Sequence, residues 1–496
     1  MLYRIRRVKC DEGKPACNRC ISTGRTCDGY SMGLTKPQET PKQFALTVES
    51  RSIEFFFDRV SPRISSLFED DSLWKRIITQ LNDLAVWNAV LATSAIFEQS
   101  ENTKGKPVHE NNLFAVESYN KAIQHLVISS SGDQHIRSVL LTCILFICIE
   151  FMRGDIVAAQ RHIRSGSSIL ESFVPSSPSN YTLSIPGSRT LDDDFAYDIV
   201  AIMSRLRLQS ALFQPNYYFP LDYPMASNEI FSSLGEARQS MYITSRETKD
   251  LVLAATQLKY SGSIFLDEFC TQARLQSQIQ QWRISFKKLF NSKSSVWSQR
   301  ERDAANVLLI QHLTSKIQII TALNPSESAN DALRTEFETM IDLSASVVNN
   351  NREFLNFHFD MGIIPCLHYI GTKCRYPILR RQILRILGSR RWREGMFDSH
   401  RSFRYVHKVM LAEEAAMPPA TEFQIEALLL DSSNKDRLPP EESRVHYAIL
   451  GPLEPKSTKQ QVSLVFLPTH SHHRMIKVLD WIPTDGDLPE VPPWID

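Results

Sequence analysis

The chain has 496 residues, of which 43% are hydrophobic and 22% are charged, and its formal net charge at pH 7 is +1. This apolar content is enough for a sizeable core, while an overall charge near zero singles out no class of partner. The start of the chain is cationic with no apolar stretch after it, so we expect no signal peptide. The most apolar run, residues 139–151, has 13 residues, whereas a membrane span needs ~20, which predicts a buried helix and no membrane contact.

Charges and cysteines are unevenly distributed along the chain. Residues 1–30 hold seven Lys or Arg and three Asp or Glu, a net charge of +4, so the other 466 residues sum to −3. Four of the nine cysteines fall in the same stretch, and the other five are scattered among apolar residues, as buried free thiols are. This usage is not that of a secreted disulfide framework and favours a reducing compartment. A small basic head on a near-neutral body predicts contact with a polyanion.

The cysteines of the head have the spacing Cys10-x6-Cys17-x2-Cys20-x6-Cys27. Thiolates are natural zinc ligands, and tetrahedral sulfur sites are the usual structural form. A module of about 30 residues buries too little apolar surface to fold alone, so metal binding would supply its folding free energy. The sequence therefore predicts a zinc site made by these four cysteines.

Four cations, Arg4, Arg6, Arg7 and Lys9, precede this cluster with no carboxylate among them. On a helix Arg4 and Arg7 share one face, and Arg6 and Lys9 share another. Charge of this density is unfavourable unless a polyanion neutralises it. A nuclear-localisation signal or a solvated surface would show the same run, and only the adjacent cysteines favour nucleic acid.

The stretch from Arg4 to Cys27 closely resembles the fungal binuclear zinc cluster (Zn(II)2Cys6) family of transcription factors. In that family six cysteines hold two zinc ions, in the pattern Cys-x2-Cys-x6-Cys, a loop with proline, then Cys-x2-Cys-x6-Cys. The four cysteines of the head match the third to sixth of the pattern, and Pro15 matches the loop proline. The resemblance implies a transcription factor of the nucleus that binds zinc and double-stranded DNA.

The sequence departs from the family pattern at its first two cysteines. The second falls on Tyr3, and the first would lie before Met1. A truncated gene model and a degenerate cluster both explain this departure; we favour truncation because the remaining positions still suit metal and DNA. A complete cluster would hold two zinc ions. The chain as written would hold at most one tightly, through Cys17, Cys20 and Cys27, because the other ion keeps only the sulfurs of Cys10 and Cys17.

The resemblance also implies how the head would read DNA. Its short helix would enter the major groove at a CGG-type element, with Arg7 at the family's base-contacting position, where an arginine fork suits guanine. Arg4, Arg6 and Lys9 would mainly contact phosphates, which position the module without reading sequence. The expected DNA-binding residues are Arg4, Arg6, Arg7, Lys9, Lys14 and Arg19.

After the head, residues 31–48 contain Pro37 and Pro41 and few large apolar residues, which predicts a linker. No apolar heptad spans this stretch, so dimerisation through a coiled coil is not supported. From residue 49 the apolar residues follow a helical period, beginning with Ile53, Phe56, Phe57 and Val60. We predict helices at 71–82, 84–99, 111–129, 134–152, 155–172, 192–213, 246–292, 302–323, 328–350, 352–372, 374–388, 400–416 and 421–431.

The C-terminal region differs in kind from these helices. Residues 461–467 and 475–481 are β-prone and are separated by a polar segment with a proline, which predicts a hairpin. Residues 392–399 and 406–414 resemble a C-terminal segment of regulatory domains in the same family. The predicted fold is mostly α, with a zinc-cluster remnant at 1–30, a linker at 31–48, an all-helical regulatory domain at 49–450, and a β tail at 451–496.

The sequence predicts a zinc-dependent regulator of RNA polymerase II transcription that binds DNA sequence-specifically. Its helical body would carry regulation, through transcription machinery, co-regulators or a small-molecule effector. One alternative is a regulator that has lost direct DNA binding and acts through the helical body. A second is an α-helical enzyme with a vestigial head, which would need convergent polar groups of shifted pKa in a cleft. No phosphate loop, nucleophile elbow or paired helical histidines are found, so we expect no enzyme.

Overall fold

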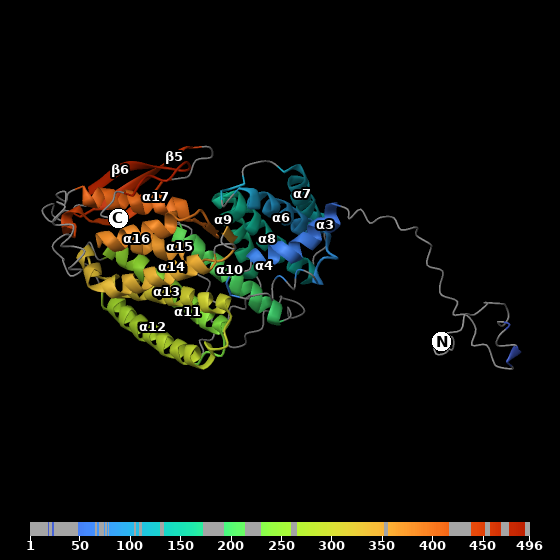
Figure 1. Ribbon diagram of the computed structural model, residues 1–496, viewed down its shortest axis with the longest axis horizontal. Coiled ribbons are helices and arrows are strands. Elements are labelled where there is room, and N and C mark those ends of the chain that lie inside the picture. The colour runs from blue at the N-terminus through green and yellow to red at the C-terminus, as the bar shows by residue number, and fades with distance from the viewer. Residues whose placement is uncertain are drawn as a thin grey trace. The chain divides into compact units, whose positions relative to one another are not determined.

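Figure 1 shows the protein as a computed structural model, which divides into two compact units, Met1–Arg51 and Ser52–Asp496. The second unit contains the helical body and the C-terminal strands. The structure describes residues 18, 22–23, 48–64, 67–68, 74, 77, 79–103, 106–108, 112–128, 133–171, 193–213, 230–258, 265–351, 356–415, 438–451, 457–467 and 476–491. The predicted linker and the predicted helix at 421–431 lie outside these residues, apart from Val48.

The first predicted helical face buries as expected. Phe56 and Val60 are fully buried, while Ile53 and Phe57 are partly buried against the core. The backbone here is not one regular helix, because a π-helical turn interrupts it. The elements are α3 (Val48–Phe55), η1 (Phe56–Val60) and α4 (Ser61–Ile64).

The next group of four helices includes one apolar helix, α8 (Asp133–Arg153), against which the other three pack. They are α6 (Leu84–Asn102), α7 (Leu113–Ile128), α8 (Asp133–Arg153) and α9 (Ile156–Glu171). Within α8 the segment His135–Arg153 is long and apolar enough to cross a membrane, but 72% of its most apolar window is buried inside the protein. Because α6 and α9 both pack against it, α8 is a core helix, as predicted.

The connection between α8 and α9 is a tight turn. Gly154 has φ +73°, a conformation that favours glycine, and a Cβ there would lie 3.1 Å from Pro107. The Asp155 carboxylate then accepts a hydrogen bond from the Ala158 backbone N–H at 2.9 Å, which caps the start of α9.

The prediction of one helix over 246–292 is wrong. The chain forms two helices there, which pack against each other and against the next one, since a continuous apolar period does not distinguish one long helix from two shorter ones that fold back. The helix predicted from 302 begins earlier, because Ser298 and Glu301 form a capping box. These elements are α10 (Asp193–Phe213), α11 (Leu234–Leu258), α12 (Leu266–Lys293), α13 (Gln299–Thr321), η3 (Glu327–Leu333) and α14 (Arg334–Asn350).

The predicted helix at 352–372 is correct only in its second half. The chain first forms the short strand β1 (Phe357–His358), which pairs in parallel with β2 (Arg393–Glu394), and β2 pairs antiparallel with β3 (Phe397–Asp398). β1 and β2 pair across more than 30 residues, so a local pattern gave no signal for β1, whereas β2 and β3 are joined by a short turn. The following helices are α15 (Ile364–Lys373), α16 (Pro377–Gly388) and α17 (Ser399–Glu414).

The C-terminal sheet confirms the predicted hairpin and adds a strand. β5 (Lys459–Phe466) and β6 (Ile476–Pro483) are antiparallel neighbours, and β4 (Val445–Leu450) pairs with the other edge of β5. β4 begins inside the range expected to be helical. The sheet lies along α17 (Figure 1), where the Tyr405 hydroxyl donates to the Ala448 carbonyl at 3.1 Å. The protein is therefore mostly α-helical with a short β tail.

Candidate functional site

The predicted zinc and DNA residues all lie outside the described part of the chain. Of residues 1–30, only Asn18, Ser22 and Thr23 are described. Among the described residues, no cluster of three or more His, Cys, Asp or Glu side chains could hold a metal ion. The residues concerned are Cys10, Cys17, Cys20 and Cys27 for zinc, and Arg4, Arg6, Arg7, Lys9, Lys14 and Arg19 for DNA.

The five cysteines of the body are free thiols, and four of them are buried as predicted. Burial raises the pKa of Cys143 to about 12 and that of Cys366 to about 12, so these thiols stay protonated and unreactive. The prediction is wrong for Cys270, which is exposed on α12. Its neighbour Phe269 is exposed as well, so an apolar neighbour in sequence did not indicate burial here.

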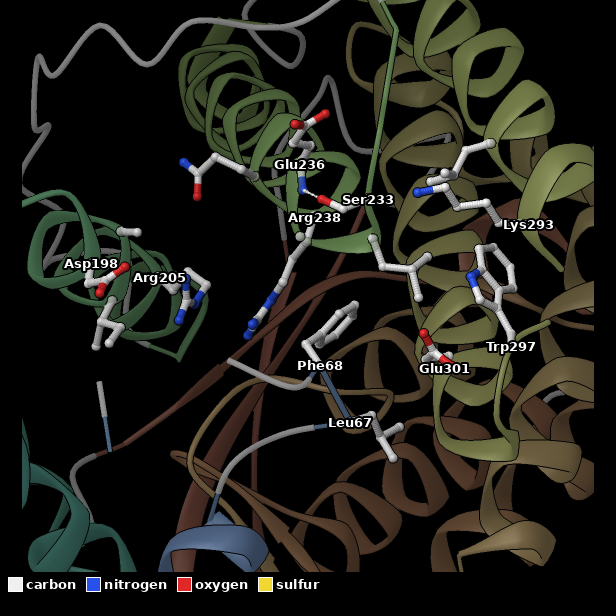
Figure 2. A pocket seen from close by; sticks show the side chains of 16 residues that line it. Leu67, Phe68, Asp198, Arg205, Ser233, Glu236, Arg238, Lys293, Trp297 and Glu301 are labelled. Atoms are coloured by element: carbon white, nitrogen blue, oxygen red, sulfur yellow. Dashed lines mark hydrogen bonds between the residues drawn. The ribbon is translucent and has the colours of Figure 1, made fainter. Parts of the chain in front are cut away.

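A cavity of about 440 Å³ lies where α10, α11 and the ends of α12 and α13 meet the segment at 67–68. Figure 2 shows its side chains, with Arg238 reaching down from α11 between Arg205 and Phe68. Its apolar wall consists of Leu67, Phe68, Ala201, Ile202, Leu234, Leu289 and Trp297, and its polar wall of Asp198, Arg205, Ser233, Glu236, Arg238, Gln239, Lys293 and Glu301, with Gly235 between them.

Two arginines of this wall share one carboxylate. Arg205 Nε lies 3.1 Å from Asp360 Oδ1, and Arg238 Nη2 lies 2.6 Å from Asp360 Oδ2. The three side chains are each 8–10% exposed. Burial alone would raise the pKa of Asp360, but the two guanidinium charges outweigh burial and hold that pKa far below its usual value. The trio thus stays ionised and carries a net charge of +1.

Arg238 also contacts the aromatic ring of Phe68. The guanidinium carbon of Arg238 lies 4.3 Å from the centre of the Phe68 ring, a cation–π geometry. The backbone supports the same corner, because the Phe359 N–H donates to the Ile64 carbonyl at 3.3 Å, and the Gln209 amide donates to the Phe359 carbonyl at 3.4 Å. Phe359 and Asp360 therefore form hydrogen bonds or ion pairs with α4, α10 and α11.

Two of the three acidic residues of the cavity wall, Glu236 and Glu301, accept hydrogen bonds at helix N-termini. Glu236 accepts hydrogen bonds from the backbone and hydroxyl of Ser232, both at 2.7 Å, beside the start of α11. Glu301 accepts from the backbone and hydroxyl of Ser298 at 2.7 and 2.8 Å, as the capping box of α13. Figure 2 shows the Glu236 carboxylate pointing away from the guanidinium of Arg238. Carboxylates at helix N-termini are partly compensated by the helix dipole.

A second carboxylate is held between two arginines in the packed core. Arg375 Nη2 lies 2.9 Å from Glu413 Oε1, Arg380 Nη2 lies 2.6 Å from Glu413 Oε2, and all three side chains have no exposed surface. Glu413 Oε1 also accepts from the Val445 N–H at 2.8 Å, and Arg375 pairs with Glu327 at 2.9 Å. This cluster joins α16, α17, η3 and β4.

The segment at 392–399, singled out by its resemblance to family regulatory domains, is buried. Gly395 has φ +54° and forms the turn between β2 and β3. The Glu394 carboxylate accepts from the Gly362 and Ile364 N–H groups at 3.0 and 2.7 Å, and from Trp392 Nε1 at 3.1 Å. These bonds fix the start of α15, so the segment acts as a packing element.

Strongly shifted pKa values belong mainly to the packed interior. Burial lowers the pKa of His312 and of His358 to about 4 each, and burial raises the pKa of Glu394. None of these three residues lines the cavity. These three shifts follow from burial in the packed core.

Comparison with known proteins assigns the family. The model of the fungal-specific transcription factor domain matches residues 51–359, and the model of the fungal Zn(2)-Cys(6) binuclear cluster domain matches residues 4–37. The first match covers more than half of the chain. The chain therefore belongs to the fungal-specific transcription factor family, and its cluster domain implies zinc binding. No solved structure matches it significantly.

Two characterised relatives are similar to the chain. The aspercryptin biosynthesis cluster-specific transcription regulator atnN of Emericella nidulans is 29% identical over 34% of the chain, and the match covers 33% of that protein. The transcription regulator lscL of Purpureocillium lilacinum is 24% identical over 67% of the chain and 89% of its own length. The matches point to a transcription regulator and not to an enzyme.

Proposed function

We propose that the protein is a zinc-dependent, sequence-specific DNA-binding regulator of RNA polymerase II transcription that acts in the nucleus at a CGG-type element. One observation carries the proposal: a cluster domain at residues 4–37 and a regulatory domain at 51–359 are joined in one chain. Every predicted zinc and DNA residue falls inside the match of the cluster domain at residues 4–37. The helical body would convey regulation through co-regulators, transcription machinery or a small-molecule effector.

The thiol count limits how the head can hold zinc. In the family arrangement, one ion would keep the sulfurs of Cys17, Cys20 and Cys27, and the other only those of Cys10 and Cys17. Three thiolates with an open position make a weaker site than four, so we propose at most one tightly held zinc ion for the chain as given.

Native mass spectrometry of the full chain tests this zinc stoichiometry. Cys20→Ser should abolish retention of the zinc ion. Cys10→Ser is an identical change outside the three-thiolate set, and it should leave zinc retention unchanged. Two tightly held ions, or equal effects of the two substitutions, would show that the ligand assignment is wrong.

The proposed DNA contacts differ in what each cation touches. We assign Arg7 to a guanine edge, and Lys9 to a phosphate together with Arg4 and Arg6; Lys14 and Arg19 complete the DNA-binding set. Arg7→Ala should cost ~1–3 kcal/mol of binding and relax preference at one guanine. Lys9→Ala should weaken binding on all sequences alike and reduce the salt slope by about one.

Binding curves on a CGG-containing duplex and a scrambled duplex, at several salt concentrations, test these roles. The chain as given should bind weakly and with little selectivity, because its recognition helix lacks a sulfur anchor before Arg4. The variants are therefore compared in a chain with a completed cluster. In this chain an added Cys-x2-Cys motif supplies the two missing cysteines, and its second cysteine replaces Tyr3. If the completed cluster shows no sequence preference, the alternative gains support: a regulator that acts through its helical body without direct DNA binding. The substitution of the family's second cysteine by Tyr3 is the observation that favours this alternative.

A further inference from the structure

We propose that the outer face of α7 is a self-association surface, on which the α7 of a second copy of this chain lies parallel and in register. This surface belongs to the helical body and not to residues 31–48, where no apolar heptad occurs. The inference goes beyond the proposed function and does not depend on it, because it follows from the residues of one helix.

The two faces of α7 are the reverse of those of an ordinary surface helix. Its buried residues, Ala115, Ser118 and Ala122, are all small, and with this face α7 packs on α6 and α8. Large aliphatic side chains lie on the opposite face and are 40–79% exposed: Leu113, Val116, Ile123, Val127 and Ile128. Figure 1 shows α7 at the periphery of the body. Single exposed apolar side chains are normal, but a continuous row of them marks an interaction surface.

The exposed row has the spacing of a coiled-coil seam. Residues 113, 116, 120, 123 and 127 alternate steps of three and four, as the a and d positions of a heptad do. We call these five residues the α7 stripe: Leu113, Val116, Asn120, Ile123 and Val127. The stripe is about 21 Å long at 1.5 Å per residue. Its central a position is Asn120, which is exposed like its neighbours.

Asn120 favours a second copy of this chain as the occupant of the stripe. In a parallel pair in register each stripe residue lies beside its own equivalent, so the two Asn120 amides can hydrogen-bond to each other. An apolar helix of another protein, or a lipid surface, would bury this amide without a partner, which is costly. The stripe therefore selects a helix with a polar residue at the same level, and this chain supplies one.

The residues beside the stripe fit the same arrangement. In a parallel pair each g position faces an e position of the other helix, so Asn112 would face Glu117 of the second copy. The Asn112 side-chain oxygen already accepts from the Ala115 N–H at 3.1 Å, which leaves its amide N–H groups to donate to that carboxylate. The exposed charges of α7, Glu117 and Lys121, cancel, so two such faces do not repel each other.

The size of the contact predicts a weak dimer. Two facing helices of 16 residues form an interface at the small end of the known range, below the ~1,200 Å² of a standard one, where transient complexes are found. Burial of the aliphatic side chains would drive the association. We therefore expect a reversible dimer with a dissociation constant in the micromolar range.

The test is sedimentation velocity of the purified full chain across the micromolar range, in a reducing buffer because Cys270 is exposed. A reversible shift from monomer to dimer is expected as the concentration rises. Val127→Glu brings two carboxylates together in the seam and should weaken dimerisation at least about tenfold. Val296→Glu, the same change at a valine that is 80% exposed between α12 and α13, should dimerise as the unaltered chain does. A chain that stays monomeric throughout, or an equal loss in both variants, overturns the proposal.

A mixture of two variants tests the parallel register. Val127→Glu and Val127→Lys should each dimerise poorly, because the pairing brings like charges together. In an equal mixture opposite charges meet across the seam, so dimers should form at least about tenfold more tightly than with either variant alone. This rescue would also show that both variants are folded. In an antiparallel pair position 127 would lie near position 113, so an absence of rescue overturns the parallel pairing.

Two further variants place the contact within the molecule. Asn120→Val removes the polar residue from the seam and should tighten association, with loss of a single oligomeric state; unchanged association would mean that Asn120 lies outside the interface. Cys17→Ser removes a proposed zinc ligand and should leave the dimer unaltered. If Cys17→Ser abolishes the dimer, the contact lies in the head and the assignment to α7 is wrong.

Discussion

Two carboxylates of this protein are each held between two arginines, yet their surroundings differ. Glu413, between Arg375 and Arg380, lies in packed core with no exposed surface on any of the three side chains. Asp360, between Arg205 and Arg238, lies beside a cavity of about 440 Å³. The same pairing of charges therefore lies within the packed core in one place and beside a cavity in the other.

Neutral acceptors also hold the arginines of the Glu413 cluster. Arg375 also donates to the Val445 carbonyl at 3.1 Å, and Arg380 donates to the Cys374 carbonyl at 2.6 Å, so protein oxygens surround the Glu413 cluster. Around Asp360 one side of the arginine pair is cavity. A buried ion pair gives little net stability by itself, and what distinguishes the two clusters is whether a ligand could enter.

The largest effect is expected when Glu413 loses its charge. Glu413→Gln takes the carboxylate away from buried Arg380 and leaves Arg375 with Glu327 alone, which should lower the free energy of unfolding by about 3–5 kcal/mol. Urea unfolding at neutral pH measures this. Glu338→Gln breaks an exposed pair with Arg334 and, as the control, should cost at most about 0.5 kcal/mol. A loss at Glu413 no larger than this control would contradict a structural role for the cluster.

A smaller effect, with a distinct signature, is expected at Asp360. Asp360→Asn should lower the free energy of unfolding by about 1–3 kcal/mol, since water in the cavity can solvate the arginines in part. Added sodium acetate should restore stability to this variant, because an anion that binds the folded state stabilises it by mass action. Glu413→Gln should gain nothing comparable, since its cluster is closed to solutes. Equal restoration of both variants would remove the distinction between the two clusters.

The smallest effect is expected at a partly exposed ion pair between α17 and β6. Lys408 Nζ lies 2.5 Å from Asp480 Oδ2. Burial alone would raise the pKa of Asp480, but the hydrogen bond and charge of Lys408 hold it below its usual value. Because the folded-state pKa is the lower one, this pair stabilises the protein above the ordinary aspartate pKa of about 4 and loses that effect as pH falls.

Asp480→Asn should therefore cost about 0.5 kcal/mol at neutral pH, a magnitude reduced by solvent screening, and the difference from the unaltered chain should vanish as pH falls below about 4. Thermal unfolding across this pH range measures it. An equally large cost at low pH would mean that Asp480 contributes through packing and not through charge, unlike the carboxylates of the two buried clusters.

The sequence predicted most helices of the body because their apolar faces repeat with a helical period. It placed α8 correctly as a buried helix. It missed the capping box of Ser298 and Glu301, although that signal is local and could have been found. It also gave no weight to Arg205 and Arg207, two charges that interrupt the apolar pattern in the second half of α10.

The sequence by itself determined the family, because the spacing of four cysteines and the adjacent cations is a local pattern that needs no fold to be recognised. It also determined the helical class of the body and the hairpin of the tail. Only the tertiary structure decided where the long helical pattern divides into α11 and α12, and which charges meet. Arg205 and Asp360 are 155 positions apart in the sequence, so only the packing of the helices brings them together. They pair because a buried charge is costly unless an opposite charge compensates it.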